Sequence, residues 1–305
     1  PTRRSSDLSS ISTITLPAPG SSVVGRAASI GTLNCNGSVD LQQGDAASIG
    51  TVNAPSVTAT GVTMTGSTYN VTAATFNGCR FTGVTPAIVS SGGSVSLRNC
   101  YMPTGSITSS SDIVLSFGSY PAATANAGIV NAVSAVVSGV VNALTLATGK
   151  SSFSAAVSVG TMNADETTFT STIAVATTAN IRSGSRCSGK ITLAANANLS
   201  VENSTVLVAV AGGGSGAIVN AGGTVNLIDS YVRANDSLLS VSGTGNVVVT
   251  RGVAGGCFFG TGLTISTVSG VNAENVRFGT LSGPATIQSV TGQNEVVDHA
   301  HITPT

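Results

Sequence analysis

The sequence predicts an all-β solenoid, a chain wound into about 13 coils of roughly 22 residues each. Three observations predict this fold. The composition is dominated by small and β-branched residues, short phrases recur along the chain, and apolar residues alternate with polar ones. Short strands of this kind, about three to a coil and joined by Gly and Asn turns, are typical of a parallel β-helix, in which each coil pairs with the next.

The composition excludes several other classes. The chain has 305 residues with 12 basic and 12 acidic side chains, so its formal net charge is zero. Charged residues make up 8%, against roughly 25% in an ordinary soluble domain. There are 43 Ser, 39 Thr and 37 Gly, and no Trp. A nucleic-acid binder needs clustered Lys and Arg, a helical bundle needs Glu, Lys and Leu, and a disordered chain needs high charge, so none of these classes fits.

Recurring phrases set the expected repeat. Residues 27–34 read AASIGTLN and residues 46–53 read AASIGTVN, which agree at seven of eight positions at an offset of 19. The five cysteines, at positions 35, 79, 100, 187 and 257, are spaced by near multiples of about 22 residues, a length typical of solenoids. We therefore expect the cysteines to share one column of a 22-residue repeat.

Two further families of phrases recur. One is apolar-Asn-Ala, as in Val52-Asn53-Ala54 and Met162-Asn163-Ala164. The other is a polar residue or Gly, then a small residue, any residue, and an apolar residue. Its members are Gly78-Cys79-Arg80-Phe81, Asn99-Cys100-Tyr101-Met102, Glu166-Thr167-Thr168-Phe169, Asn203-Ser204-Thr205-Val206, Asp229-Ser230-Tyr231-Val232 and Asn275-Val276-Arg277-Phe278. We expect Asn and Thr side chains to form ladders that hydrogen-bond from coil to coil.

Alternation of period two predicts the strands. It is clear in residues 94–98 (SVSLR) and 224–227 (TVNL). It is imperfect from Leu263, where Ile265 is in step and Val268 comes one residue late. No window shows a helical stripe with a cap and a stop.

The phrases at 98–102 (RNCYM) and 202–206 (ENSTV) resemble those of the right-handed parallel β-helix superfamily, which includes pectin lyases, viral tailspikes and bacterial surface passenger domains. The resemblance covers about residues 9–290 and is closest to the non-enzymatic surface and adhesin members. It implies a right-handed helix, and it leaves function open because this fold carries enzymes, adhesins and scaffolds alike.

The chain divides into three predicted parts. Residues 1–8 (PTRRSSDL) resemble the translation of a sequencing-library adapter, so we expect an adapter-derived or disordered tail. Residues 9–291 are the predicted β-helix domain, and residues 292–305 a polar tail or cap. Residues 127–147 would pass a hydropathy window for a membrane span, but polar residues such as Asn131 and Asn142 interrupt them. We expect a buried solenoid segment there, with a membrane span as the alternative.

We predict no catalytic, cofactor-binding or metal-binding residue. Glu202 and Asp229, near Arg233 and Arg251, could converge from adjacent coils, but the polygalacturonase signatures of the resembled family are absent and the body contains no His. The segment 298–301 (DHAH) could supply at most three metal ligands from the predicted tail, so we expect no functional metal there.

The cysteines and threonines leave alternatives open. An odd number of cysteines argues against a complete disulfide framework. Cys79 and Cys100, one coil apart, could bond, and the alternative that we favour is a ladder of buried free thiols. Pairs such as Thr58 and Thr60 are typical of ice-binding solenoids, but they do not recur at a 22-residue period, which argues against that function.

We therefore expect an extracellular or cell-surface module with a structural or adhesive role, not an enzyme. Open solenoid ends and low charge favour self-association, end to end or lateral, into a filament or layer. Such a module could also carry a glycan-binding surface, while nucleic acid and membrane spans are not expected. The alternative is a polysaccharide lyase or glycoside hydrolase, and a third class is a tailspike-like trimeric receptor binder.

Overall fold

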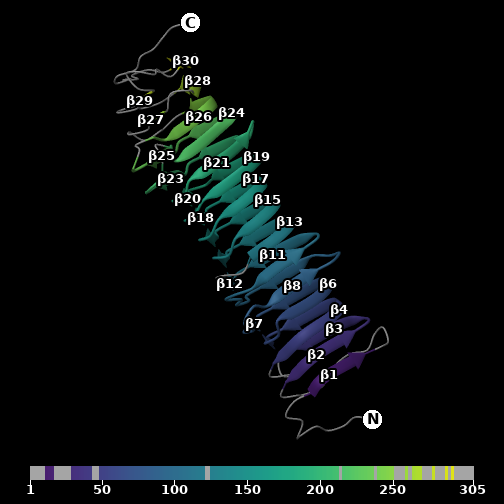
Figure 1. Cartoon of the computed structure of the whole chain (residues 1–305). Helices are drawn as coiled ribbons and strands as arrows, with labels where there is room; N and C mark the ends of the chain where they lie inside the picture. Colours follow the sequence, from purple (N-terminus) through teal and green to yellow (C-terminus); the bar gives the residue numbers. More distant parts are fainter. Residues whose placement is uncertain are drawn as a thin grey trace. The chain divides into compact units, whose positions relative to one another are not determined.

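A computed structural model describes residues 11–16, 29–42, 48–120, 124–212, 215–236 and 239–250, together with the short strands at 258–259, 263–269, 277–278, 286–287 and 290–291. These residues form strands and turns without a helix, and the strands pair in parallel. The fold is a parallel β-solenoid of about 12 turns spaced about 18 residues apart. The predicted fold class is confirmed. The chain forms two compact units, residues 1–144 and 145–305, each a succession of coils (Figure 1).

The coils of the first unit pass three faces. The first face holds β1 (Ile11–Leu16), β2 (Ile30–Cys35), β8 (Ala87–Ser90), β10 (Ser106–Ser109) and the starts of β4 (Ile49–Thr60), β6 (Thr68–Asn77) and β13 (Thr124–Val133). The second face holds β3 (Ser38–Gln42), β9 (Val95–Arg98), β11 (Asp112–Ser116) and the ends of β4, β6 and β13. The third face holds the short strands β5 (Thr63–Met64), β7 (Arg80–Phe81), β12 (Ser119–Tyr120) and β14 (Val136–Val137).

The second unit repeats this plan. After β15 (Val141–Gly149), the first two faces are built from β17 (Val157–Asp165), β19 (Ile173–Arg182), β21 (Ile191–Ala195), β22 (Asn198–Glu202), β24 (Ile218–Ile228) and β26 (Val241–Thr250). The third face holds β16 (Ser152–Phe153), β18 (Thr168–Phe169), β20 (Arg186–Cys187), β23 (Thr205–Val208) and β25 (Tyr231–Ala234). The last strands are β27 (Phe258–Phe259), β28 (Leu263–Ser269), β29 (Arg277–Phe278), β30 (Thr286–Ile287) and β31 (Val290–Thr291).

The repeat is shorter than predicted. Asn34 and Asn53 are neighbours at an offset of 19, and Asn53 and Asn70 are neighbours at an offset of 17. The predicted 22-residue period is wrong, since successive coils are about 18 residues apart. The cysteine spacing suggested the longer period, but the cysteines do not share one column. Cys35 ends β2 on the first face, whereas Cys187 lies in β20 on the third face. Coil length also varies, since the offset between Asn198 and its neighbour Thr224 is 26. The spacing of the cysteines along the sequence therefore does not give the coil length.

The repeated AASIGT phrase marks true register, since its two copies pair as neighbouring strands at the predicted offset. Its glycine is required by close backbone approach. A Cβ on Gly50 would lie 2.0 Å from the carbonyl oxygen of Gly31 in the neighbouring coil. The phrase therefore recurs because the backbones of adjacent coils meet there.

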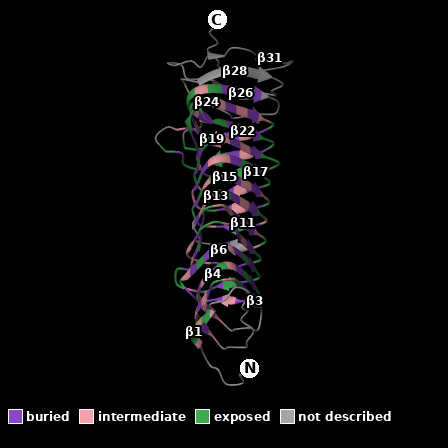
Figure 2. Ribbon diagram, turned by 90° about the vertical axis from the view of Figure 1, so that its right-hand side faces the viewer, coloured by how far each residue is buried: buried purple, intermediate pink, exposed green. Residues whose placement is uncertain are grey.

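Buried residues alternate with less buried ones along the strands (Figure 2), and most of the buried residues are apolar. In β9, Val95 and Leu97 are fully buried, and in β24 Val225 and Leu227 are, which confirms both predicted strands. The late Val268 of β28 is also explained. The register between β26 and β28 shifts by one residue, so that Val268 pairs with Val249.

The core of each unit contains packed rings. In the first unit, Tyr69, Phe76 and Phe81 meet edge to face at centroid distances of 5.2 to 6.5 Å. In the second unit, Phe153 and Phe169 stack at 5.1 Å with an interplanar angle of 15°. Both arrangements are favourable geometries for aromatic pairs.

The uncharged segment 127–147 belongs to the solenoid. It forms parts of β13 and β15 and all of β14, with residues such as Val130 and Val141 buried. In the part of the chain that the structure describes, there is no helix of the length and hydropathy needed to span a membrane.

Candidate functional site

In the part of the chain that the structure describes, ten sharp turns join the second and third faces, and the first residue of each has a positive φ. These turn residues are Gly61, Gly78, Asn99, Phe117 and Ser134 in the first unit, and Lys150, Glu166, Ser183, Asn203 and Asp229 in the second, with φ between 45° and 66°. This conformation costs an ordinary L-residue about 1–2 kcal/mol. The coil retains it because the chain must bend there. The polar-small-x-apolar phrases therefore mark this turn, except the phrase at 275–278, whose turn lies outside the described residues.

The residue after each turn residue lies on the inner side of the corner, and we call these residues the corner column. In the second unit they are Ser151, Thr167, Ser204 and Ser230, together with Ser185 two residues after Ser183, and all are buried hydroxyl residues. The hydroxyls of Thr167 and Ser230 donate to the carbonyl two residues earlier, at 2.8 and 2.7 Å. The Ser230 hydroxyl also accepts the backbone N–H of Ser204 from the preceding coil, at 3.4 Å. The column thus satisfies buried backbone groups that the sharp turn would leave unpaired.

In the first unit the corner column includes Cys79 and Cys100. The Cys100 thiol donates to the carbonyl of Arg98, two residues earlier, at 3.3 Å, as the serines do. Cys79 also contacts the carbonyl of Ala59 in the preceding coil at 3.3 Å. The four cysteines that the structure describes are buried and free, so the predicted free thiols are confirmed for them, although only these two share a column. Cys257 lies outside the described residues.

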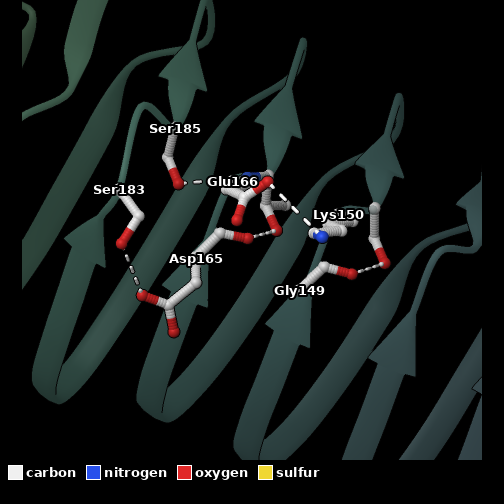
Figure 3. Close-up of polar contacts among 8 residues, drawn as sticks. Gly149, Lys150, Asp165, Glu166, Ser183 and Ser185 are labelled. Carbon is white, nitrogen blue, oxygen red and sulfur yellow. Dashed lines mark hydrogen bonds and ion pairs between the residues drawn. The ribbon is translucent and has the colours of Figure 1, made fainter.

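Charged side chains line the outside of the same turns in the second unit (Figure 3). The Lys150 ammonium lies 4.0 Å from the Glu166 carboxylate, with side chains 68% and 56% exposed. The Ser183 hydroxyl donates to Asp165 at 3.2 Å. An ion pair this exposed contributes about 0–1 kcal/mol to the stability of the fold. The charged groups at this turn face solvent and do not form an enclosed catalytic site.

The carboxylates considered for catalysis lie at this turn as well. Glu202 pairs with Ile228, the residue before Asp229, so the two carboxylates are carried by adjacent coils and both are exposed. Arg233 lies on β25, opposite Leu207 on the third face. Arg251 lies outside the described residues. The structure therefore brings together two of the four candidates, on an open surface.

Two charged residues, Lys190 and Asp236, hydrogen-bond to the backbone of a surface loop. The sequence does not predict these contacts. Asp236 accepts the backbone N–H groups of Ala211 and Gly212 at 3.0 and 2.9 Å. The Lys190 ammonium donates to the carbonyl of Ala211 at 3.0 Å. These contacts anchor the loop of a long coil. The partners are 21 to 25 residues apart in the sequence, beyond the reach of any local pattern.

Two exposed rings lie near this turn in the first unit. The Arg80 guanidinium lies 5.5 Å from the ring centroid of Tyr101, and Arg98 lies 5.6 Å from that of Phe117. Tyr101 is 41% and Phe117 54% exposed. Each pair joins neighbouring coils, at a distance typical of cation–π contacts.

Two regular columns of polar side chains cover the first face of the first unit. Residues Thr13, Thr32 and Thr51 pair in one column, and Thr15, Asn34, Asn53 and Asn70 pair in the other. The amides of the second column bond from coil to coil, Asn53 to Asn34 and Asn70 to Asn53, both at 2.8 Å. The predicted ladders are confirmed, and another in the second unit joins Asn180 to Asn163 at 2.9 Å.

The Thr-x-Thr pair at Thr58 and Thr60 does not recur in the neighbouring coils, where it meets Asp40 and Gln42 on one side and Thr75 and Asn77 on the other. What does recur is a mixed pattern on the first face, in which Thr13/Thr15 is followed by Thr32/Asn34, Thr51/Asn53 and Thr68/Asn70.

A shallow hollow of about 300 Å³ lies beside these columns. It is lined by Ala54, Pro55, Asn70, Val71, Thr72, Val89 and Ser91. None of these side chains is charged, so the hollow offers contact area without acid–base chemistry.

The described residues contain no group of three or more possible metal ligands. The candidate segment 298–301 lies outside them, so that prediction is not tested. Against known proteins, the chain matches no family model, no curated sequence and no solved structure.

Proposed function

We propose that this protein is an extracellular structural and adhesive β-solenoid, and that the first face of its first unit is a lateral contact surface between copies. The supporting observation is the uncharged polar array on that face. Its outward side chains are Thr13, Thr15, Thr32, Asn34, Thr51, Asn53, Thr68, Asn70, Ser106, Thr108 and Asn126, and the apolar residues Ala87 and Val89 lie in the same columns.

The physical case rests on repetition and on the absence of repulsion. Coils are about 4.8 Å apart and alternate residues of a strand about 6.7 Å apart, so the face presents a regular grid. Each contact between two such grids is repeated from coil to coil. Many weak contacts made together give a high avidity. Formal charge is zero for the chain, and low net charge favours association.

Two substitutions in one strand test the proposal. Thr51→Lys places a charge in the array, and Thr58→Lys places the same charge on the second face of β4, where Thr58 is exposed. We expect sedimentation velocity and electron micrographs to show assemblies for the wild type and Thr58→Lys, and their loss in Thr51→Lys. A wild type that stays monomeric at high concentration contradicts the proposal.

Ice is a second candidate ligand, and the one observation that favours it is the regular spacing of the polar columns on the first face. In the first coils of this face, threonine occupies one column and asparagine most of the other. Thermal hysteresis and inhibition of ice recrystallisation by the wild type, both reduced in Thr51→Lys, would support this function. Absence of both activities would leave association between copies as the role of the face.

The enzymatic alternative, a polysaccharide lyase or hydrolase like members of the resembled superfamily, is tested separately. An assay for unsaturated or reducing sugar products on acidic glycans would detect it. If such products appear, Glu202→Gln and Asp229→Asn should abolish them. Unchanged activity in both variants would exclude these two carboxylates.

A further inference from the structure

Two thiols of the corner column lie side by side in adjacent coils. The backbone N–H of Tyr101 donates to the carbonyl of Cys79 at 3.0 Å, and Arg80 pairs with Tyr101 as a parallel bridge. Cys79 and Cys100 precede these two paired residues in their own coils. Neighbouring parallel strands are about 4.8 Å apart, which lies within the Cα separation of about 4.4–6.8 Å that disulfides require.

The two thiols lie at the same corner of adjacent coils. Both residues are buried, with 1% and 2% of their surface exposed. The interaction between the two side chains lowers the pKa of Cys79 and raises that of Cys100. One sulfur is therefore favoured as the thiolate nucleophile, and its neighbour stays a protonated thiol able to resolve an oxidised intermediate.

We propose that Cys79 and Cys100 are an oxidative modification site, which a peroxide converts into a disulfide that staples two adjacent coils of the first unit. The Cys79 thiolate attacks hydrogen peroxide, breaks its O–O bond and releases hydroxide, which leaves a sulfenic acid. The Cys100 sulfur then attacks the sulfenic sulfur, and the displaced hydroxyl leaves as water with the thiol proton. The two thiols together lose two electrons, which reduce the peroxide.

The other described cysteines pair with residues that carry no thiol. Cys187 pairs with Phe169 on one side and Val206 on the other, and Cys35 pairs with Leu16. Burial raises the pKa of Cys187 to about 12, which disfavours its thiolate. Oxidation should therefore be selective for the Cys79–Cys100 pair once local opening admits the oxidant.

The disulfide is expected to stabilise the first unit. Closing the loop between positions 79 and 100 restricts the unfolded chain. For a chain of this size, a staple of typical strength raises Tm by several degrees.

The test uses the full chain carrying Cys35→Ala, so that trypsin yields peptide 27–80 with Cys79 alone and peptide 99–150 with Cys100. The matched control adds Cys100→Ser. That substitution keeps a donor at the corner, because Ser204 and Ser230 occupy this position in other coils. Protein treated with hydrogen peroxide is unfolded, alkylated and analysed by mass spectrometry, and its Tm is measured with and without a reductant.

We expect the two peptides to become disulfide-linked, and Tm to rise by several degrees, both reversed by the reductant. The Cys100→Ser control should show no linked peptide and no rise in Tm, and dimedone should trap a sulfenic acid on Cys79. Two outcomes would overturn the proposal. Either both thiols remain alkylatable after peroxide treatment, or Cys187 enters disulfides as readily as Cys79 does.

Discussion

The same turn is built with different chemistry in the two units. In the first unit the turn residue is Gly, Asn, Phe or Ser, and the corner column contains thiols at Cys79 and Cys100. In the second unit Lys, Glu and Asp also adopt the turn, and every corner residue is Ser or Thr. Cys100 and Ser230 share a small buried side chain that donates to the carbonyl two residues earlier. The corner therefore accepts a small donor in either unit, while the first unit also places Val62, Gly118 and Ala135 there, and the outward residue varies.

The cores differ in a similar way. The first unit packs three rings edge to face, and the second stacks two. Phe81 of β7 and Phe169 of β18 occupy the same position on their third faces. Each is the second, buried residue of a two-residue strand. Equivalent substitutions at these two positions therefore compare the units directly.

The largest effect is expected from deleting these rings. Phe81→Ala and Phe169→Ala should each lower the free energy of unfolding by about 3–5 kcal/mol, because each leaves a cavity in a close-packed core. Phe81→Ala should be the more severe change, since Phe81 contacts both Tyr69 and Phe76 whereas Phe169 stacks on Phe153. Urea denaturation measures the difference. An equal or larger loss for Phe169→Ala would show that ring geometry does not distinguish the cores.

Alkaline pH should weaken the first unit, which buries two tyrosines. Burial raises the pKa of Tyr69 and of Tyr120 above the ordinary value of 10.0. A raised folded-state pKa means that the stability is complete below pH 10 and falls above it, by about 1.4 kcal/mol per pH unit for each phenol. The second unit should lose stability too, from the buried thiol of Cys187.

Hydrogen exchange followed from neutral pH to about pH 11 measures this loss unit by unit. Tyr69→Phe and Tyr120→Phe remove the ionisable groups and should each flatten the alkaline decline of the first unit. An unchanged slope in both variants would show that other groups govern alkaline unfolding.

Exchanging the donors of the corner column should have a smaller effect. Ser230→Ala removes the acceptor of the Ser204 N–H and the donor to Ile228, and should cost about 1–3 kcal/mol. Cys100→Ser keeps a donor and should cost less than about 1.5 kcal/mol. Both are measured by urea denaturation. Equal losses would mean that the hydrogen bond does not matter at this corner.

The smallest effects are expected at the turn residue, with opposite signs in the two units. Gly78→Ala forces a side chain into φ +63° and should cost about 1 kcal/mol. Glu166→Gly relieves the same strain at φ 48° and should gain up to about 1 kcal/mol, less a small loss from the exposed Lys150 ion pair. Glu166→Gln is the control, because it removes the charge and keeps the backbone strain. Thermal unfolding that shows the same sign for both main substitutions would contradict the common turn geometry.

Prediction from the sequence succeeded where the signal was local. Alternation located β9 and β24. In the sequence, the late Val268 and the polar-small-x-apolar phrases are only an irregularity and a repeat, and the structure shows that they mark a shift of register and the turn with positive φ. The Asn ladders were expected from composition, and the structure places them on named faces.

Prediction failed where the signal depended on register between coils. The cysteine spacing misled because the four described thiols lie at three different places in the coil, with only Cys79 and Cys100 in one column. The anchor formed by Lys190 and Asp236 joins groups that no local pattern connects. For the same reason, the alignment of Thr and Asn in mixed columns on the first face was not expected, since it depends on register.

By itself, the sequence determined that the chain is all-β, coiled and nearly uncharged, because strand alternation, turn residues and composition are properties of single segments. Only the tertiary structure decided which residues become neighbours, since the offset between stacked side chains is 16 at Asn126 and Asn142 but 26 at Asn198 and Thr224. The thiol pair and the polar grid both arise from that unequal stacking. What each of these side chains contacts is decided by the residue in the neighbouring coil. Parallel backbone hydrogen bonds between the coils determine which residue that is.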